Sequence, residues 1–127
     1  MRLLLDTHVF IWSVTGASRL KPAARKRIET AREVYVSSAS IWEIAIKSRL
    51  GKIEGDLDML VGAIGASGFL ELPVTAQHAA ATSRLALHHA DPFDRLLLAQ
   101  AQVEPLRLLT TDRALIRYGD FVEPLGG

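Results

Sequence analysis

Four carboxylates occupy positions that suggest chemistry. Asp6 ends the apolar run RLLLD, a candidate strand, and Asp112 follows LRLLTT, just past the end of another candidate strand. Glu43 interrupts the apolar helical sequence IWEIAI, and Asp94 lies in the first turn of a candidate helix in HHADPFDRLLLAQA. Each position also has a structural explanation. An aspartate can cap a helix or favour its first turn, and Glu43 can pair with Lys47 one helical turn later.

The chemistry open to these acids depends on whether they meet. Carboxylates that lie close together repel one another. A hard divalent cation such as Mg²⁺ or Mn²⁺, which prefers oxygen ligands, would neutralise them. Such a site activates water and stabilises the leaving oxygen in phosphodiester hydrolysis. The four acids therefore raise the hypothesis of a metal-dependent hydrolase.

The elements that would position the acids alternate between strand and helix. Apolar and β-branched runs predict strands at 2–6, 34–37, 69–72 and 106–109, and a small closing strand around residue 122. Helices are predicted at 8–14, from 22 to about 32, from a cap at Ser38 or Ser40 to Gly51, and at 56–66, 75–87, 93–103 and 113–118. This alternation predicts an α/β protein, a three-layer sandwich with a central parallel sheet of four to five strands. Active sites of such sheets lie beyond the carboxyl ends of the strands, where Asp6 and Asp112 are expected.

Length and composition narrow the class of protein. The chain has 127 residues, which suits a single domain over 1–127. It has no cysteine, which excludes a disulfide scaffold, a thiolate zinc site and a cysteine nucleophile. No apolar stretch approaches the ~18 residues that a membrane span needs, and the first residues do not read as a secretory signal. We therefore expect a cytoplasmic protein without a membrane partner.

Positive charge is concentrated between residues 19 and 52. This stretch holds nine basic and three acidic residues, a local charge of +6 in a chain whose net charge is +1. A basic surface beside an acidic centre suits a polyanion, and a solvated helix face is the alternative. The candidates for phosphate contact are Arg19, Arg25, Lys47 and Arg49.

Two adjacent histidines, His88 and His89, precede Asp94 and Asp112 in the chain. Adjacent histidines rarely point at one metal ion, and there is no cysteine to complete a zinc site. We therefore do not expect zinc there.

The sequence resembles the PIN domain, and in particular the VapC-like toxins of bacterial type II toxin–antitoxin systems. The matching segments are LLLDTHVFIW, SSASIWEIAIKSRLGK, HHADPFDRLLLAQA and LLTTD, in the same order and spacing along almost the whole chain. HHxDPFDR is typical of one PIN subgroup. The resemblance implies a PIN-like parallel-sheet sandwich and an endoribonuclease with Mg²⁺ or Mn²⁺ as cofactor.

The resemblance also assigns roles by position. It makes Asp6, Glu43, Asp94 and Asp112 the catalytic and metal-binding acids, with Thr111 as the hydroxyl neighbour of the last one. Asp6 and Asp94 would hold a first cation, and Asp112 would complete its ligand set. Glu43 would either bind a second cation or orient the attacking water, and the membership of Asp91 stays open.

The partners implied are a single-stranded or looped RNA, a cognate antitoxin and a second copy of the chain. For the homodimer, the apolar surface is expected at Phe10, Trp12 and the helix at 57–64.

Other functions remain open from the residues alone. The chain could be a binding module whose acids are helix caps and whose basic stretch docks a partner, and cation binding would separate this function from a nuclease. A phosphotransfer receiver fits poorly because no lysine follows Lys52. A haloacid-type phosphatase fits poorly because His8 stands where its second aspartate would be.

Overall fold

Five parallel strands form the central layer of the computed structural model, which describes residues 2–53 and 55–125. The strands are β1 (Arg2–Leu5), β2 (Glu33–Ser37), β3 (Leu70–Leu72), β4 (Arg107–Thr110) and β5 (Val122–Pro124). Their order across the sheet is β3-β2-β1-β4-β5, with all neighbouring pairs parallel. Leu5 at the end of β1 lies in register with Val36 on one side and Leu109 on the other.

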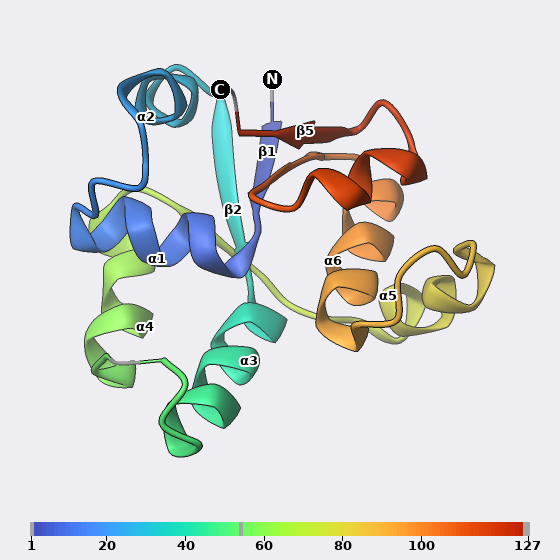
Figure 1. Ribbon diagram of the computed structural model, residues 1–127, viewed down its shortest axis with the longest axis horizontal. Helices are drawn as coiled ribbons and strands as arrows, with labels where there is room; N and C mark the ends of the chain where they lie inside the picture. Colours follow the sequence, from blue (N-terminus) through green and yellow to red (C-terminus); the bar gives the residue numbers. More distant parts are fainter. Residues whose placement is uncertain (1, 54, 126–127) are drawn as a thin grey trace.

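Helices cover both faces of this sheet (Figure 1). They are α1 (Thr7–Thr15), α2 (Pro22–Glu29), α3 (Ser38–Arg49), α4 (Leu57–Ala66), α5 (Ala76–Ala81) and α6 (Pro92–Val103). Short 3-10 helices follow α5 at Thr82–Arg84 and β4 at Arg113–Tyr118. Figure 1 shows α1, α2 and α4 on one side of β1 and β2, and α5 and α6 on the other.

The core has two halves because successive side chains of a strand point to opposite faces. Leu3 and Leu5 of β1 join the cluster that packs under α1, α2 and α4. Leu4 joins the second cluster, which contains Leu97 and Leu98 of α6. All three leucines of β1 are fully buried, which explains the continuous apolar run at the start of the chain.

The predicted α/β class, the parallel sheet with helices on both faces and the small closing strand are confirmed. The helix predicted at 75–87 is too long, because α5 ends at Ala81. Instead, the guanidinium group of Arg95 donates hydrogen bonds to the carbonyl oxygens of Thr82, Leu85, Ala86 and His89. A side chain of α6 thus satisfies these acceptors and holds the segment from Leu85 to Asp91 outside a helix.

Two smaller expectations were wrong. Ser37, not Ser38 or Ser40, caps α3, since its hydroxyl accepts a hydrogen bond from the amide of Ala39. Phe10 is fully buried in the core and offers no surface to a second copy of the chain. Within residues 2–53 and 55–125, no helix is long and apolar enough to cross a membrane.

Candidate active site

Asp6 occupies the carboxyl end of the central strand. Its Oδ1 caps α1 by accepting a hydrogen bond from the amide of Val9 at 3.0 Å. Its Oδ2 accepts from Thr110 Oγ1 at 2.5 Å and from the amide of Thr111 at 3.1 Å. The residue is only 6% exposed, and this burial raises the pKa of Asp6 above its ordinary value. Asp6 thereby joins the ends of β1 and β4.

Glu43 reaches the same edge from α3. This helix begins directly after β2, next to the end of β1, so its second turn comes close to the start of α1. Thr7 Oγ1 donates to Glu43 Oε1 at 2.6 Å and lies 3.0 Å from Ser40 Oγ. Lys47 Nζ donates to Glu43 Oε2 at 2.5 Å. The pairing with Lys47 that the sequence left open is therefore present, and it is made by a glutamate with only 4% exposure.

The start of α6 carries two further acids. Asp91 caps the helix, and its Oδ1 accepts a hydrogen bond from the amide of Asp94 at 3.0 Å. Asp94 Oδ2 accepts from His89 Nε2 at 2.8 Å. The pKa of Asp94 is raised to about 6, mainly by burial and further by the charges of Asp91 and Asp6, whereas the hydrogen bond from His89 opposes the rise. Asp94 is thus a carboxylate in a poorly solvated, negatively charged place.

Asp112 follows β4 and caps the 3-10 helix over Arg113–Tyr118, accepting from the amide of Ala114 at 2.9 Å. Its Oδ2 lies 4.0 Å from His89 Nε2. The buried hydroxyl of Thr110 accepts from the amide of Asp112 at 3.0 Å while it donates to Asp6. The hydroxyl that links the acids therefore belongs to Thr110, and Thr111 contributes its amide to Asp6.

These acids surround one cleft of about 200 Å³. It is lined by Asp6, Thr7, His8, Glu43, Lys47, Asp91, Asp94, Thr111 and Asp112. The fold thus brings together the four acids that the sequence singled out, from the end of β1, the second turn of α3, the first turn of α6 and the segment after β4, and adds Asp91. This convergence follows from the parallel sheet, whose strand ends share one edge.

Sequence reasoning missed the role of Thr7, whose hydroxyl holds the carboxylate of Glu43 and whose signal in the sequence was its position next to Asp6. The sequence places the hydroxyls of Thr110 and Thr111 at the same end of the strand without distinguishing them, and the structure shows that Thr110 donates to Asp6. His89 was considered only as half of an adjacent pair. In the structure His89 forms a hydrogen bond with Asp94, whereas the ring of His88 lies edge-on against the ring of Tyr118.

The basic residues of the 19–52 stretch do not form one surface. Lys47 lines the cleft, and Arg49 is exposed at the end of the same helix. Arg25 donates to the carbonyl oxygen of Ala17 at 2.8 Å and borders a different cavity at the start of β2. Arg19 is exposed, and its guanidinium carbon lies 5.8 Å from the centre of the Trp12 ring.

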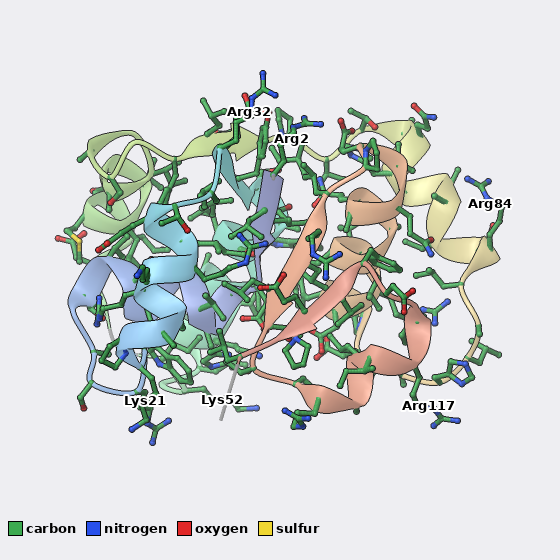
Figure 2. The ribbon with its side chains drawn as sticks, turned by 90° about the horizontal axis from the view of Figure 1, so that it is seen from above. Arg2, Lys21, Arg32, Lys52, Arg84 and Arg117 are labelled. Atoms are coloured by element: carbon green, nitrogen blue, oxygen red, sulfur yellow. The ribbon has the colours of Figure 1, made fainter. Side chains whose placement is uncertain are left out.

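Figure 2 shows the same division for two other members of the stretch, because Lys21 and Arg32 point outward on opposite sides of the molecule. The hypothesis of one basic surface beside the acids is therefore wrong for the stretch as a whole, and the alternative of solvated helix faces fits its exposed members. The turn after α2 returns the chain to the start of β2, far from the carboxyl ends of the strands.

A divalent cation has a suitable set of donors at one end of the cleft. His89, Asp94 and Asp112 each offer a ligand atom, and these atoms all lie within 4.8 Å of one another. Two carboxylates and one imidazole suit Mn²⁺, and the carboxylates alone also suit Mg²⁺. The residues present therefore fit a cation of this class.

Comparisons with known proteins identify the family to which the chain belongs. The family model of the PIN domain matches residues 3–120. Ribonuclease VapC22 of Mycobacterium tuberculosis is 33% identical over 116 residues, which cover 89% of this chain and 88% of the relative. The chain therefore belongs to the PIN domain family and is related to the VapC ribonucleases.

Solved structures share the fold. A chain of the VapBC2 complex of Rickettsia felis, bound to a DNA fragment of its promoter, superposes with a TM-score of 0.68 over 93% of both chains at 14% identity. A chain of a toxin–antitoxin complex from Klebsiella pneumoniae gives a TM-score of 0.64 over 89% of both chains at 19% identity.

Proposed function

We propose that this chain is a metal-dependent endoribonuclease, the toxin component of a type II toxin–antitoxin system. The observation that carries the proposal is the convergence of Asp6, Glu43, Asp94 and Asp112 on one cleft at the carboxyl edge of a PIN fold. The 33% identity to a named ribonuclease supports RNA as the substrate.

In this proposal Asp94 and Asp112 hold a Mg²⁺ or Mn²⁺ ion, with His89 as a further ligand and Asp6 at the border of the site. When bound, the cation supplies a Lewis acid that activates water and neutralises charge on the phosphate. Asp6 is already fixed by three hydrogen bonds, so it needs little reorganisation to complete the site.

Glu43 is the residue that we assign to the attacking water. Both of its oxygens are oriented, one by Thr7 and the other by Lys47, and the carboxylate faces the cleft. A carboxylate held in this way can accept a hydrogen bond from water and direct its lone pair at phosphorus. The products are a new terminal phosphate and a hydroxyl on the other fragment.

The substrate is expected to be single-stranded or looped RNA, since a small cleft lined by acids gives no access to a rigid duplex. The phosphates next to the cut would meet Lys47 in the cleft and the exposed Arg49 nearby, with the exposed Arg19 as a more distant contact. Arg25 is not among these contacts, because it donates to the carbonyl oxygen of Ala17 and borders a cavity at the start of β2.

We also propose a cognate antitoxin and a homodimer as partners. Solved chains of the same fold come from VapBC and toxin–antitoxin complexes. The surface offered by α4 supports association, because Met59 is 47% and Val61 49% exposed. Light scattering across micromolar concentrations tests the dimer, and a monomer throughout would refute it.

The experiment that tests the function measures cleavage of a labelled, unstructured RNA by the purified chain with EDTA, Mg²⁺ or Mn²⁺. Cleavage is expected only with a divalent cation. Asp94→Asn removes a proposed metal ligand and should lower the single-turnover rate at least ~100-fold. Removing a residue that only supports a metal ligand already costs about 10–100-fold. Asp120→Asn, at an exposed position outside the cleft, is the matched control and should cleave like the wild type.

Cleavage that persists in EDTA, or an Asp94→Asn variant as active as the wild type, would refute the proposal. A chain that binds no Mn²⁺ would instead be a binding module whose acids serve as helix caps.

A further inference from the structure

The two ends of the cleft differ in how their negative charge is balanced. At one end, the ligand atoms of His89, Asp94 and Asp112 converge within the span that a cation needs. At the other end, Glu43 already has a cation of the protein itself, the ammonium group of Lys47. Lys47 is the single lysine or arginine among the described residues that line the cleft.

The position of Lys47 is set by the helix. It follows Glu43 by four residues on α3, so the two side chains lie on the same face one turn apart. Its side chain is 30% exposed, whereas that of Glu43 is 6% exposed. The pKa of Lys47 is raised, mainly by the hydrogen bond to Glu43, with smaller contributions from the charges of Asp91 and Asp94. The ammonium group therefore stays protonated and faces carboxylates from two helices.

This arrangement leaves little reason for a second divalent ion at Glu43. One oxygen of Glu43 accepts from Thr7 and the other from Lys47. A dication placed beside the second oxygen would also meet the repulsion of the ammonium group at short range. Among the described residues, no set of converging metal ligands includes Glu43.

We propose that Lys47 takes the place of a second divalent cation beside Glu43, so that the cleft binds a single divalent ion and presents the ammonium group to the substrate phosphate. The inference rests on the proposed metal-dependent function and decides between the two roles that the sequence left open for Glu43. Glu43 orients the attacking water, and Lys47, a residue of the chain itself, balances the charge of its carboxylate.

The number of bound ions tests this inference. The signal of free Mn²⁺ in electron paramagnetic resonance, followed during titration of the purified full chain, gives the stoichiometry without any reference to catalysis. One ion per chain is expected for the wild type. Lys47→Met removes the charge at similar length, and two ions per chain are expected, because Glu43 then needs another counter-ion.

Three further variants sharpen the result. Lys47→Arg keeps the charge and should bind one ion. Combining Lys47→Met with Glu43→Gln removes the new ligand and should return the count to one. Lys52→Met is the matched control, since Lys52 is exposed and points away from the molecule in Figure 2, and it should bind one ion.

The dependence of the single-turnover cleavage rate on Mn²⁺ provides a second measurement. It should be hyperbolic for the wild type and sigmoidal for Lys47→Met. Two ions bound by the wild type would overturn the inference while leaving the nuclease function intact, and this outcome does not depend on the folding of any variant. One ion bound by a folded Lys47→Met would also overturn it. No bound Mn²⁺ in the wild type would overturn the proposed function itself.

Discussion

Two parts of the parallel sheet carry charge in opposite ways: a balanced part away from the cleft, and the acidic edge where the strands end. In the balanced part, which includes the starts of β1 and β2 and the middle of β5, acids and bases are matched. Arg2 Nε donates to Glu33 Oε1 at 2.8 Å, and both Arg27 and Arg107 donate to Glu123 at 2.7–3.0 Å. The two guanidinium groups lower the pKa of Glu123 below its ordinary value. The ionised form of Glu123 is therefore more favourable in the folded protein than in the unfolded chain.

Where the strands end, acids outnumber bases. The cleft there holds Asp6, Glu43, Asp91, Asp94 and Asp112, with Lys47 as the basic residue among the described lining. Burial raises the pKa of Asp6 and Asp94, the opposite of the shift at Glu123. Ionised Glu123 therefore stabilises the fold, whereas ionised Asp6 and Asp94 destabilise it. The acidic edge can gain stability from binding a cation.

A divalent cation bound at the acidic edge should neutralise its carboxylates and stabilise the folded protein. An ion that binds only the folded state at a hundredfold excess over its Kd contributes about 2.7 kcal/mol, which corresponds to a rise of roughly 5–10 °C in melting temperature. Differential scanning fluorimetry with Mn²⁺ measures this shift. Asp94→Asn should lose most of it, whereas Asp120→Asn should keep it, and an unchanged melting temperature for the wild type would contradict the comparison.

Replacing Thr110 should lower the free energy of unfolding more than replacing Thr111. Thr110→Val removes a buried hydroxyl that donates to Asp6 and accepts from the amide of Asp112. Because one partner is a carboxylate, the free energy of unfolding should fall by about 1.5–3 kcal/mol. Thr111→Val, at an exposed side chain, is the matched control and should change it by less than about 0.5 kcal/mol. Urea denaturation measures both, and equal effects would refute the role of Thr110.

The pH dependence of stability should reveal the cost of Asp94. Its pKa rises from 3.8 to about 6 on folding, so the metal-free folded state holds the proton more tightly than the unfolded chain. This contribution is complete below about pH 4 and is lost as the pH rises through 6. Relative to the wild type in EDTA, Asp94→Asn should therefore gain about 1–2 kcal/mol between pH 4 and pH 7, after allowance for partial solvent screening. A stability difference between the two proteins that does not change with pH would show that folding does not raise the pKa of Asp94.

Breaking the ion pairs of Glu123, in the balanced part of the sheet, should affect stability alone. Glu123→Gln leaves Arg27 and Arg107 without their shared carboxylate, and the free energy of unfolding should drop by about 1 kcal/mol at pH 7. The loss should vanish at low pH, because the lowered pKa of Glu123 makes its contribution disappear once the carboxyl group is protonated. Glu29→Gln, at an exposed position, is the control. A fall in the cleavage rate constant of folded Glu123→Gln would contradict the division between the balanced part of the sheet and the acidic edge.

The smallest expected effect concerns RNA affinity. In the Asp94→Asn background, Arg49→Ala should weaken binding a few-fold and reduce the slope of log affinity against log salt by about 0.7, the value for one phosphate of a single strand. Arg25→Ala, at a cavity near the start of β2, should change neither quantity. Fluorescence anisotropy with a labelled RNA measures both. Equal effects of the two variants would mean that RNA wraps around the molecule rather than lying at the cleft.

Much of the architecture was accessible from the sequence because its causes are local. The apolar run before Asp6 and the alternation of strand and helix predicted the parallel sheet and its carboxyl edge. Caps such as Asp91 follow from residue type and position alone. The premature end of α5 was not accessible, because it depends on Arg95, which lies 13 residues after Thr82 in the chain.

The sequence by itself determined which acids could form a site, since their placement after strands, in the first turn of a helix or inside an apolar helix is a property of neighbouring residues. The tertiary structure decided which groups hold and balance those acids. Thr110 rather than Thr111 donates its hydroxyl to Asp6, and Arg95 holds the segment that brings His89 to Asp94. Lys47 of the basic stretch reaches the cleft, whereas Arg25 borders a different cavity. The physical reason is separation along the chain. Asp6 and Thr110 are 104 residues apart, and a hydrogen bond between them exists only once the whole sheet has assembled.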